Sequence, residues 1–231
     1  MAVVTAAVVD AHHTPETPER LLDAAERLFA ERGVDAVSVR AVNAAAGANV
    51  AAVHYHFGSK EALVEAVLRR RMDALAERRR GMLAALSTDP TPPPRAVLEV
   101  LVRPLAELSA DPRSPGRAYV RFLATLAGGG PETRALLGAA FAPQFGPLDA
   151  ALARALPDVP TPVHHFRLAL VGPIVVTTLA EPEAAAVTLH ITHEPAELDP
   201  VDHAAVVDAL LDAITGALAA PAPPDHPGGT R

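Results

Sequence analysis

Three side chains between residues 55 and 60 can each donate a hydrogen bond to a phosphate: the Tyr55 hydroxyl, the His56 ring and the Lys60 ammonium. They lie in a window, residues 36–60, that contains cations but no aspartate or glutamate. The whole chain has a net charge of −7, and the stretch 168–230 carries carboxylates but no lysine or arginine. Because neutralising DNA phosphates requires cations, the acid-free window is the candidate nucleic-acid surface of an otherwise acidic protein.

Two short helices joined by a tight turn are predicted within this window. Ser38 and Asn49 are the expected N-caps of the two helices, and Gly47 in the turn tolerates a positive φ. The second helix of such a pair reads the major groove, which predicts base contacts from residues near its start: Asn49, Val50, Ala51, Ala52 and His54. Asn49 can instead be used entirely for capping, and His54 can face solvent. The structural alternative for the whole window is a compact three-helix bundle with Tyr55 and Phe57 as ordinary core aromatics.

Residues 20–67 resemble the DNA-binding domain of the TetR/AcrR family of repressors. The matching residues occur at the family's spacing and are Ala24-Ala25, Leu28-Phe29, Gly33, Ser38-Val39-Arg40, Ala46-Gly47, Tyr55-His56-Phe57-Gly58-Ser59-Lys60-Glu61 and Leu63. The resemblance implies phosphate contacts from Tyr55, His56 and Lys60, with Ser38 and Arg40 near the DNA backbone or base edges. Asn43 departs from the family, which usually has alanine there, so different packing or a different DNA contact is expected at this position.

The composition predicts an all-α fold, because half of the residues are hydrophobic, alanine dominates that half, and only 3% of the chain is aromatic. Proline and capping residues divide the rest of the chain into expected helices near 60–86, 95–110, 116–127, 132–155, 162–180 and 200–219. We expect a three-helix DNA-binding domain with the helix-turn-helix at 17–63 and a larger helical effector-binding and dimerisation domain at 64–220. A disordered arm at 1–16 and a disordered tail at 221–231 are expected to flank them.

The family resemblance implies that the larger domain binds a small-molecule effector and forms a homodimer. Two apolar stripes at helical spacing are the candidate dimer interface: Leu168, Val171, Val175 and Leu179, with Val207, Leu210, Leu211, Ile214 and Leu218. The alternative is that either stripe is intrachain core. The scarce large side chains are candidates for the effector pocket and favour a largely apolar effector: Met72, Met82, Tyr119, Phe122, Phe141, Phe145 and Phe166.

No catalytic motif is visible in the chain, so an enzyme is not expected. The chain has no cysteine, which excludes thiolate catalysis and cysteine-ligated zinc. No cofactor or metal site is predicted: neighbouring His164 and His165 are expected to point to different faces, and His190 with His193 lack a clear third ligand. The longest apolar run, 168–180, is judged too short to span a membrane, and a cytoplasmic location is expected. The alternatives to a DNA-binding repressor of a palindromic operator are an enzyme or a small-molecule-binding protein without DNA function.

Overall fold

A computed structural model describes residues 17–184 and 202–221 of the chain. The predicted arm at 1–16, His190 with His193, and residues 222–231 of the predicted tail lie outside this range. Most of the described residues are helical, and the helices are α1 (Thr17–Arg32), α2 (Val39–Ala45), α3 (Ala52–Phe57), α4 (Lys60–Leu86), α5 (Pro94–Ser109), α6 (Pro115–Gly128), α7 (Pro131–Ala155), α8 (Thr161–Ala180) and α10 (His203–Ala219). The all-α prediction is confirmed, with the predicted helices in place to within a few residues.

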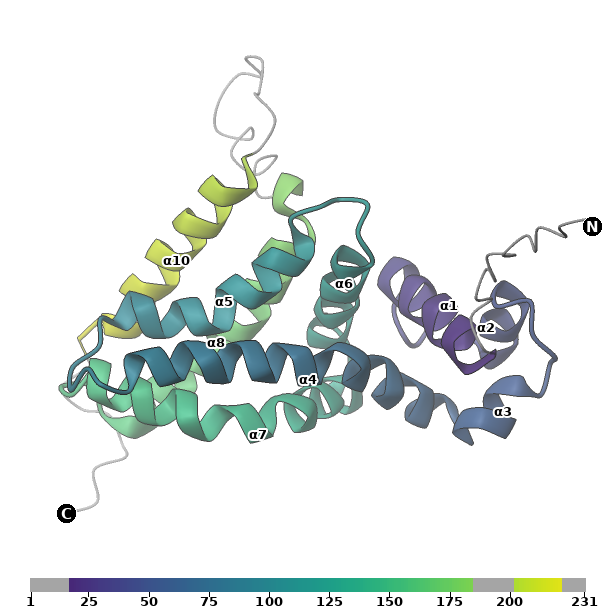
Figure 1. Ribbon diagram of the computed structural model, residues 1–231, viewed down its shortest axis with the longest axis horizontal. Coiled ribbons are helices and arrows are strands. Elements are labelled where there is room, and N and C mark those ends of the chain that lie inside the picture. Colours follow the sequence, from purple (N-terminus) through teal and green to yellow (C-terminus); the bar gives the residue numbers. More distant parts are fainter. Residues whose placement is uncertain (1–16, 185–201, 222–231) are drawn as a thin grey trace, which may run out of the picture.

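The α4 helix connects the two ends of the molecule (Figure 1). It begins beside α3, and its 27 residues correspond to about 40 Å of α-helix. The helices α1 and α3 pack against it, with α2 packed on both of them, while α5 and α7 also pack against α4. The α4 helix therefore belongs to both parts of the molecule.

A continuous hydrophobic core links the N-terminal helices to the larger domain. The ring of Phe29 in α1 stacks on the ring of Phe122 in α6, with 5.8 Å between their centroids. The buried Tyr119 hydroxyl donates a hydrogen bond of 2.8 Å to the carbonyl oxygen of Leu68 in α4, and burial raises the pKa of Tyr119. The α6 helix therefore holds both α1 and α4.

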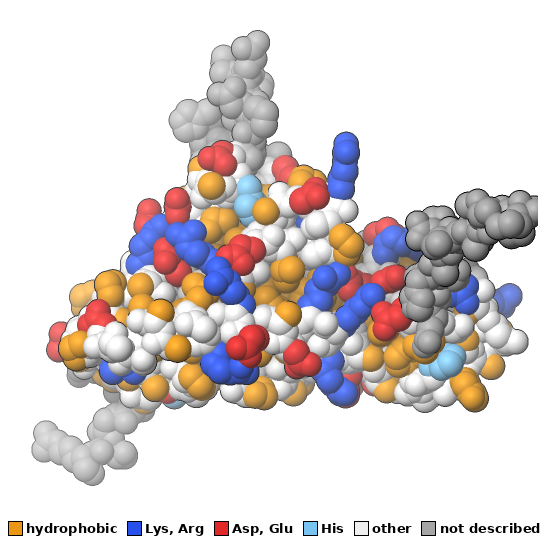
Figure 2. Space-filling view, viewed as in Figure 1, with side chains coloured by type: hydrophobic (Ala, Val, Ile, Leu, Met, Phe, Trp, Pro, Cys, Tyr) orange, Lys and Arg blue, Asp and Glu red, His pale blue; other side chains and the backbone are white. Residues whose placement is uncertain are grey.

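Ion pairs, of which those of Glu26 involve a buried carboxylate, connect α1 to α4 near the same place. Arg70 donates to Asp23 at 2.5 Å and to Glu19 at 3.1 Å, and Arg71 donates to Glu26 at 3.2 Å. Only 4% of the Glu26 side chain is exposed. Its pKa is raised because the effect of burial exceeds that of the neighbouring guanidinium groups. Figure 2 shows acidic and basic side chains next to one another where α1 approaches α4.

Two expectations about the later helices need correction. The last helix does not begin at residue 200: its N-cap is Asp202, whose carboxylate accepts a hydrogen bond from the Ala204 N–H. The run at 168–180 is part of a 20-residue helix, α8, which by length and composition alone could cross a membrane. Close to half of that helix is buried inside the protein, and it packs against α5, α6 and α10 as a core helix does.

Candidate nucleic-acid interface

The predicted turn between α2 and α3 has the expected geometry. Gly47 has a φ of 61° and Gly58, which ends α3, has a φ of 82°; both values lie in the region that favours glycine. The Ser38 hydroxyl accepts from the Ala41 N–H and caps α2, and the Ser59 hydroxyl accepts from the Ala62 N–H and caps α4. The Ser38 cap matches the role predicted for that residue.

The start of α3 differs from the prediction. Ala51, not Asn49, is the N-cap of α3 and provides no side-chain hydrogen bond. The Asn49 carboxamide oxygen accepts from the Ala51 N–H within the turn, at 3.0 Å. Asn49 therefore orders the turn that precedes the helix, and its remaining amide N–H groups are exposed to solvent.

Asn43 supplies the missing cap from the neighbouring helix. Its side chain is buried, its Oδ1 accepts from the Val53 N–H at 3.1 Å, and its Nδ2 donates to the Val50 carbonyl oxygen at 2.6 Å. Val53 is the second residue of α3, where an N–H has no partner within the helix. Asn43 therefore fixes α3 against α2 by satisfying two backbone groups. The sequence indicated only that this residue departs from the family pattern, not that it would cap α3.

Most of the predicted DNA-contacting side chains share an exposed surface at the α3 end of the molecule. Tyr55 is 84% exposed and Val50 is 69% exposed. The other exposed candidates are Ser38, Arg40, Asn49, Ala51, His54 and His56, and Lys60 is partly exposed. Ala52 is buried in the core, so it is not available for a base contact. Figure 2 shows mainly hydrophobic, histidine and basic side chains on this end.

Two of these side chains have local partners that restrict what they can do. The His54 Nδ1 lies 3.1 Å from the Gly58 carbonyl oxygen, to which it can only donate, so Nε2 is the ring nitrogen available to DNA. The His56 ring packs edge-on against the Tyr55 ring.

Glu61 follows Lys60 directly, and its pKa is lowered by hydrogen bonds from its own backbone N–H and from Ser59. An ionised carboxylate therefore borders the surface that carries the phosphate donors.

The arginines of α4 occur in two runs, 69–71 and 78–80, and several of them contact other helices. Arg70 and Arg71 bind carboxylates of α1, and Arg78 pairs with Glu107 of α5. Arg79 is buried, donates to Gln144 of α7 at 2.6 Å, and has its pKa lowered to about 10 by burial. Arg80 pairs with Glu77 of the same helix. The two runs therefore connect α4 to three other helices.

The predicted pocket residues separate into different environments. Tyr119 and Phe122 are fully buried core residues, Phe166 is 63% exposed, and Met82 is partly buried against the core. Met72 borders a surface groove between α4 and α7. Phe141 and Phe145 line an apolar cavity of about 340 Å³ between α5, α7 and α8, together with Leu101, Leu137, Gly172 and Arg134. This cavity brings together only two of the seven predicted residues.

The predicted dimer stripes are buried within a single chain. Each of these side chains is less than 7% exposed: Leu168, Val171, Val175, Leu179, Val207, Leu210, Leu211, Ile214 and Leu218. They pack α8 and α10 against the rest of the domain, so they correspond to the intrachain alternative. The opposite face of α8 presents three exposed hydrophobic side chains four residues apart, Phe166, Leu170 and Ile174.

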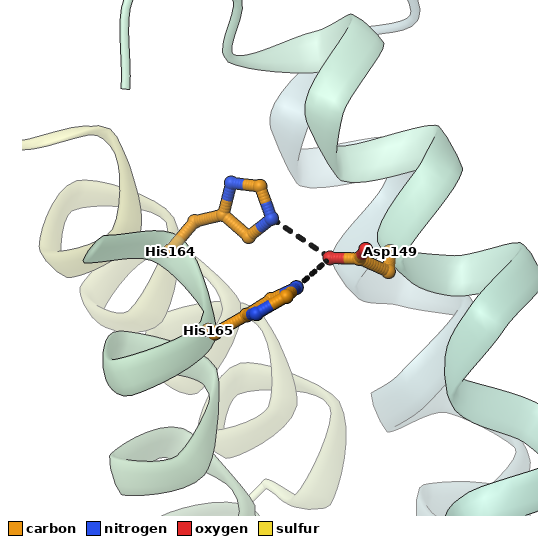
Figure 3. Close-up of side chains that lie close together, drawn as sticks. All are labelled: Asp149, His164 and His165. Atoms are coloured by element: carbon orange, nitrogen blue, oxygen red, sulfur yellow. Dashed lines mark hydrogen bonds and ion pairs between the residues drawn. The ribbon is translucent and has the colours of Figure 1, made fainter. Parts of the chain in front are cut away.

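The expectation that His164 and His165 point to different faces is wrong. The Nε2 atoms of both rings lie 2.7 Å from the same carboxylate oxygen, Oδ1 of Asp149 (Figure 3). Sequence inspection missed Asp149 because it lies on another helix, 15 residues before His164.

Comparison with known families agrees with this architecture. Residues 21–67 match the family described as bacterial regulatory proteins, tetR family, and residues 99–218 match the tetracyclin repressor-like C-terminal domain. A curated relative is the HTH-type transcriptional repressor KstR2 of Rhodococcus jostii, 43% identical over 82 residues. The matched region spans 36% of this chain and 38% of that repressor.

Solved structures share the fold over most of their length. The fatty acid degradation regulator FadR from Bacillus halodurans has a TM-score of 0.59 at 16% identity, covering 86% of this chain and 97% of its own. FadR from Bacillus subtilis, in complex with stearoyl-CoA, has a TM-score of 0.56 at 15% identity, covering 86% and 98%. With both family domains matched in order and the helix-turn-helix in place, the chain belongs to the tetR family of bacterial regulatory proteins.

Proposed function

We propose that this protein represses transcription by binding a palindromic operator as a homodimer, and that a small, largely apolar effector releases it. The observation that carries the DNA-binding part is the exposed set of donors beside α3, of which Tyr55 is 84% exposed although it is a large aromatic residue. An aromatic side chain left in solvent at a helix-turn-helix is explained by contact with DNA. The relative KstR2 is a repressor, which supports the sign of regulation proposed for this chain.

Within this proposal, phosphate contacts and base contacts come from different residues. Tyr55, His56 and Lys60 bind phosphates, and Ser38 and Arg40 approach the DNA backbone or base edges from α2. Asn49, Val50, Ala51 and His54 face the bases. Small side chains at the tip of α3 permit close approach to the major groove and apolar contact with thymine methyl groups.

Replacing Lys60 by alanine is expected to weaken binding to all DNA sequences rather than to change the preferred sequence. Removing one phosphate contact lowers the slope of log affinity against log salt by about one unit for each Lys60 engaged. The measurement is a gel-shift titration at several salt concentrations, using the DNA upstream of the protein's own coding region. Arg154→Ala is the matched control, since Arg154 is an exposed cation at the end of α7, on the effector domain.

The outcomes of this titration separate two failures. An unchanged affinity and salt slope in K60A would remove Lys60 from the proposed contacts while leaving the regulator function in place. A wild-type protein that binds neither this DNA nor any palindrome at low salt would overturn the proposed function itself.

The dimer surface that we propose is the exposed face of α8, with Phe166, Leu170 and Ile174, continued by the exposed small residues of α10. Spacing of four residues places the three large side chains on one side of the helix. A hydrophobic row of this kind, exposed along one face of a helix in a single chain, would be covered by the same row of a second copy in a two-fold dimer. Two copies of α3 then read half-sites about 34–36 Å apart, or a multiple of that distance.

The effector site that we propose is the apolar cavity containing Phe141 and Phe145. Its lining is hydrophobic apart from Arg134, which suits an apolar ligand. FadR from Bacillus subtilis binds stearoyl-CoA, a molecule with a long apolar chain. A ligand between α7 and α8 is expected to shift α7, and the contact of Gln144 on α7 with Arg79 on α4 passes the shift to the helix that carries α1–α3.

Filling the cavity is expected to abolish effector binding without unfolding the protein. Gly172 lines the cavity, and a Cβ added there meets no atom within 4 Å, so Gly172→Leu introduces a side chain into open space and favours the helix. We expect this variant to lose most of its binding of the apolar fluorescent probe 1-anilinonaphthalene-8-sulfonate, measured by fluorescence titration. Gly81→Leu, at an equally open glycine on α4, is the control. Equal probe binding by G172L and wild type would contradict this location for the site.

A further inference from the structure

Asp149, His164 and His165 form a compact cluster where α7 meets the start of α8. Their ligand-type atoms, one from each side chain, all lie within 4.8 Å of one another. Both histidine Nε2 atoms are 2.7 Å from Oδ1 of Asp149, and the two rings meet edge-on with centroids 4.8 Å apart. Figure 3 shows the two rings turned toward the same carboxylate. Nothing in the proposed regulatory function uses this arrangement.

The convergence of the two rings is unusual for neighbouring helical residues. Successive side chains of a helix point about 100° apart, and here His164 is buried while His165 is largely exposed. Ordinary surface hydrogen bonding does not require both imidazoles to reach one oxygen atom. Two imidazole nitrogens and a carboxylate oxygen converging on one point are, by contrast, a set of donors that suits a transition-metal ion.

We propose that these three side chains bind one divalent transition-metal ion of the kind that prefers imidazole, such as Zn²⁺, Co²⁺ or Ni²⁺. The ligand atoms are Nε2 of each histidine and a carboxylate oxygen of Asp149. Two nitrogen ligands exclude Ca²⁺ and Mg²⁺ as the preferred ions, because those ions select oxygen ligands. The exposed side of His165 leaves room for water to complete the coordination.

The observed distances are compatible with this site after small side-chain rotations. Metal–nitrogen bonds of about 2.0–2.1 Å and tetrahedral angles separate neighbouring ligand atoms by about 3.3 Å. The present nitrogen–oxygen separations of 2.7 Å therefore open by about 0.6 Å when a metal replaces the hydrogen-bonding protons. The other ring nitrogen of His164, Nδ1, is buried without a partner among the described residues. The hydrogen-bonded cluster already leaves that atom unpaired, so metal binding adds no new buried unpaired atom.

Metal binding at this cluster would join α7 to α8 across the short loop at 156–160. The exposed hydrophobic row on α8 begins at Phe166, immediately after the two histidines. A bound ion therefore fixes the start of the helix that we propose as the dimer surface. The metal proposal does not depend on that dimer, because all three ligands come from one chain.

The test is a titration of the untagged, full-length protein, stripped with EDTA and dialysed, with Co²⁺ followed by visible absorption and with Zn²⁺ as competitor. We expect a single tight site per chain, and a loss of affinity of at least about 100-fold in His165→Ala and in Asp149→Asn. Both variants keep the buried His164, and the exposed position of His165 makes unfolding of H165A unexpected. Circular dichroism confirms that helix content is retained.

A double variant, His190→Ala with His193→Ala, is the matched control because it removes two other histidines. We expect it to bind Co²⁺ as tightly as the wild type. Loss of the site in this control with full binding by H165A and D149N would overturn the proposal, as would a wild-type protein that binds neither ion at micromolar concentration. Equal binding by all variants would also overturn it, since it would indicate unspecific surface sites.

Discussion

Placing arginine on the exposed face of α8, in a Leu170→Arg, Ile174→Arg double variant, is expected to convert the proposed dimer into a folded monomer. The two side chains are 54% and 48% exposed in one chain, so the substitutions leave the intrachain core intact. In the dimer they would bury two unpaired charges per subunit, and burying an unpaired charge costs several kcal/mol. Losing the second half-site contact is expected to lower operator affinity by at least about 100-fold.

Sedimentation equilibrium and gel shift together measure this effect. The expected pattern is a monomeric mass, unchanged helix content, and binding to a palindromic duplex that is no tighter than binding to a single half-site. Ala74→Arg, at an exposed position on α4, is the control for adding a surface charge. A double variant that stays dimeric would place the subunit interface elsewhere on the molecule.

Removing the Arg71 guanidinium, in Arg71→Met, is expected to destabilise the protein by about 3 kcal/mol, because it deprives a buried carboxylate of its closest cation. In this variant the remaining cation near Glu26 is Arg70, whose Nη1 lies 3.8 Å from Oε2 of Glu26. The adjacent Arg69→Met is the matched control. Arg69 pairs with Glu65 on the exposed surface of α4, where such pairs contribute less than about 0.5 kcal/mol.

Denaturant unfolding of R71M, of Glu26→Gln and of the double variant measures the coupling between the two groups. The double variant is expected to recover much of the lost stability, since it no longer buries an unpaired charge.

Burial raises the pKa of Glu26 in the folded protein above the pKa that this carboxyl has in the unfolded chain. The ionised form therefore costs folding stability, and this cost falls as the pH falls. Without Arg71 the pKa rises further. The deficit of R71M should therefore shrink as the pH is lowered, and a deficit independent of pH would exclude Glu26 as its cause.

The local signals in the sequence predicted the helices and the cap of α2 at Ser38. Ser38 and Ser59 cap α2 and α4 by hydrogen bonds to backbone groups three residues away, an interaction that short-range spacing reveals. The cap of α3 comes from Asn43, ten residues before Val53. No local rule predicts that contact, because it depends on how α2 and α3 cross.

The apolar stripes of α8 and α10 show a second limit of sequence patterns. Periodicity indicates that one face of a helix is buried, but it does not indicate whether the burial is within the chain or between two chains. In the folded protein the stripe with Leu168 and Val171 faces inward. The proposed dimer surface lies on the other side of α8, where Phe166 was predicted to line the effector pocket and Ile174 had no predicted role.

The sequence by itself determined the all-α class, the approximate bounds of the helices and the acid-free helix-turn-helix, because these depend on composition, capping and spacing along a single segment. Only the tertiary structure decided which contacts join segments far apart in the chain. Asn43 reaches α3, Arg71 reaches the buried Glu26, and two neighbouring histidines reach Asp149 on another helix. Each of these contacts depends on the packing of two helices. The closely spaced residues proposed to contact DNA could therefore be found in the sequence, and the side-chain clusters around them could not.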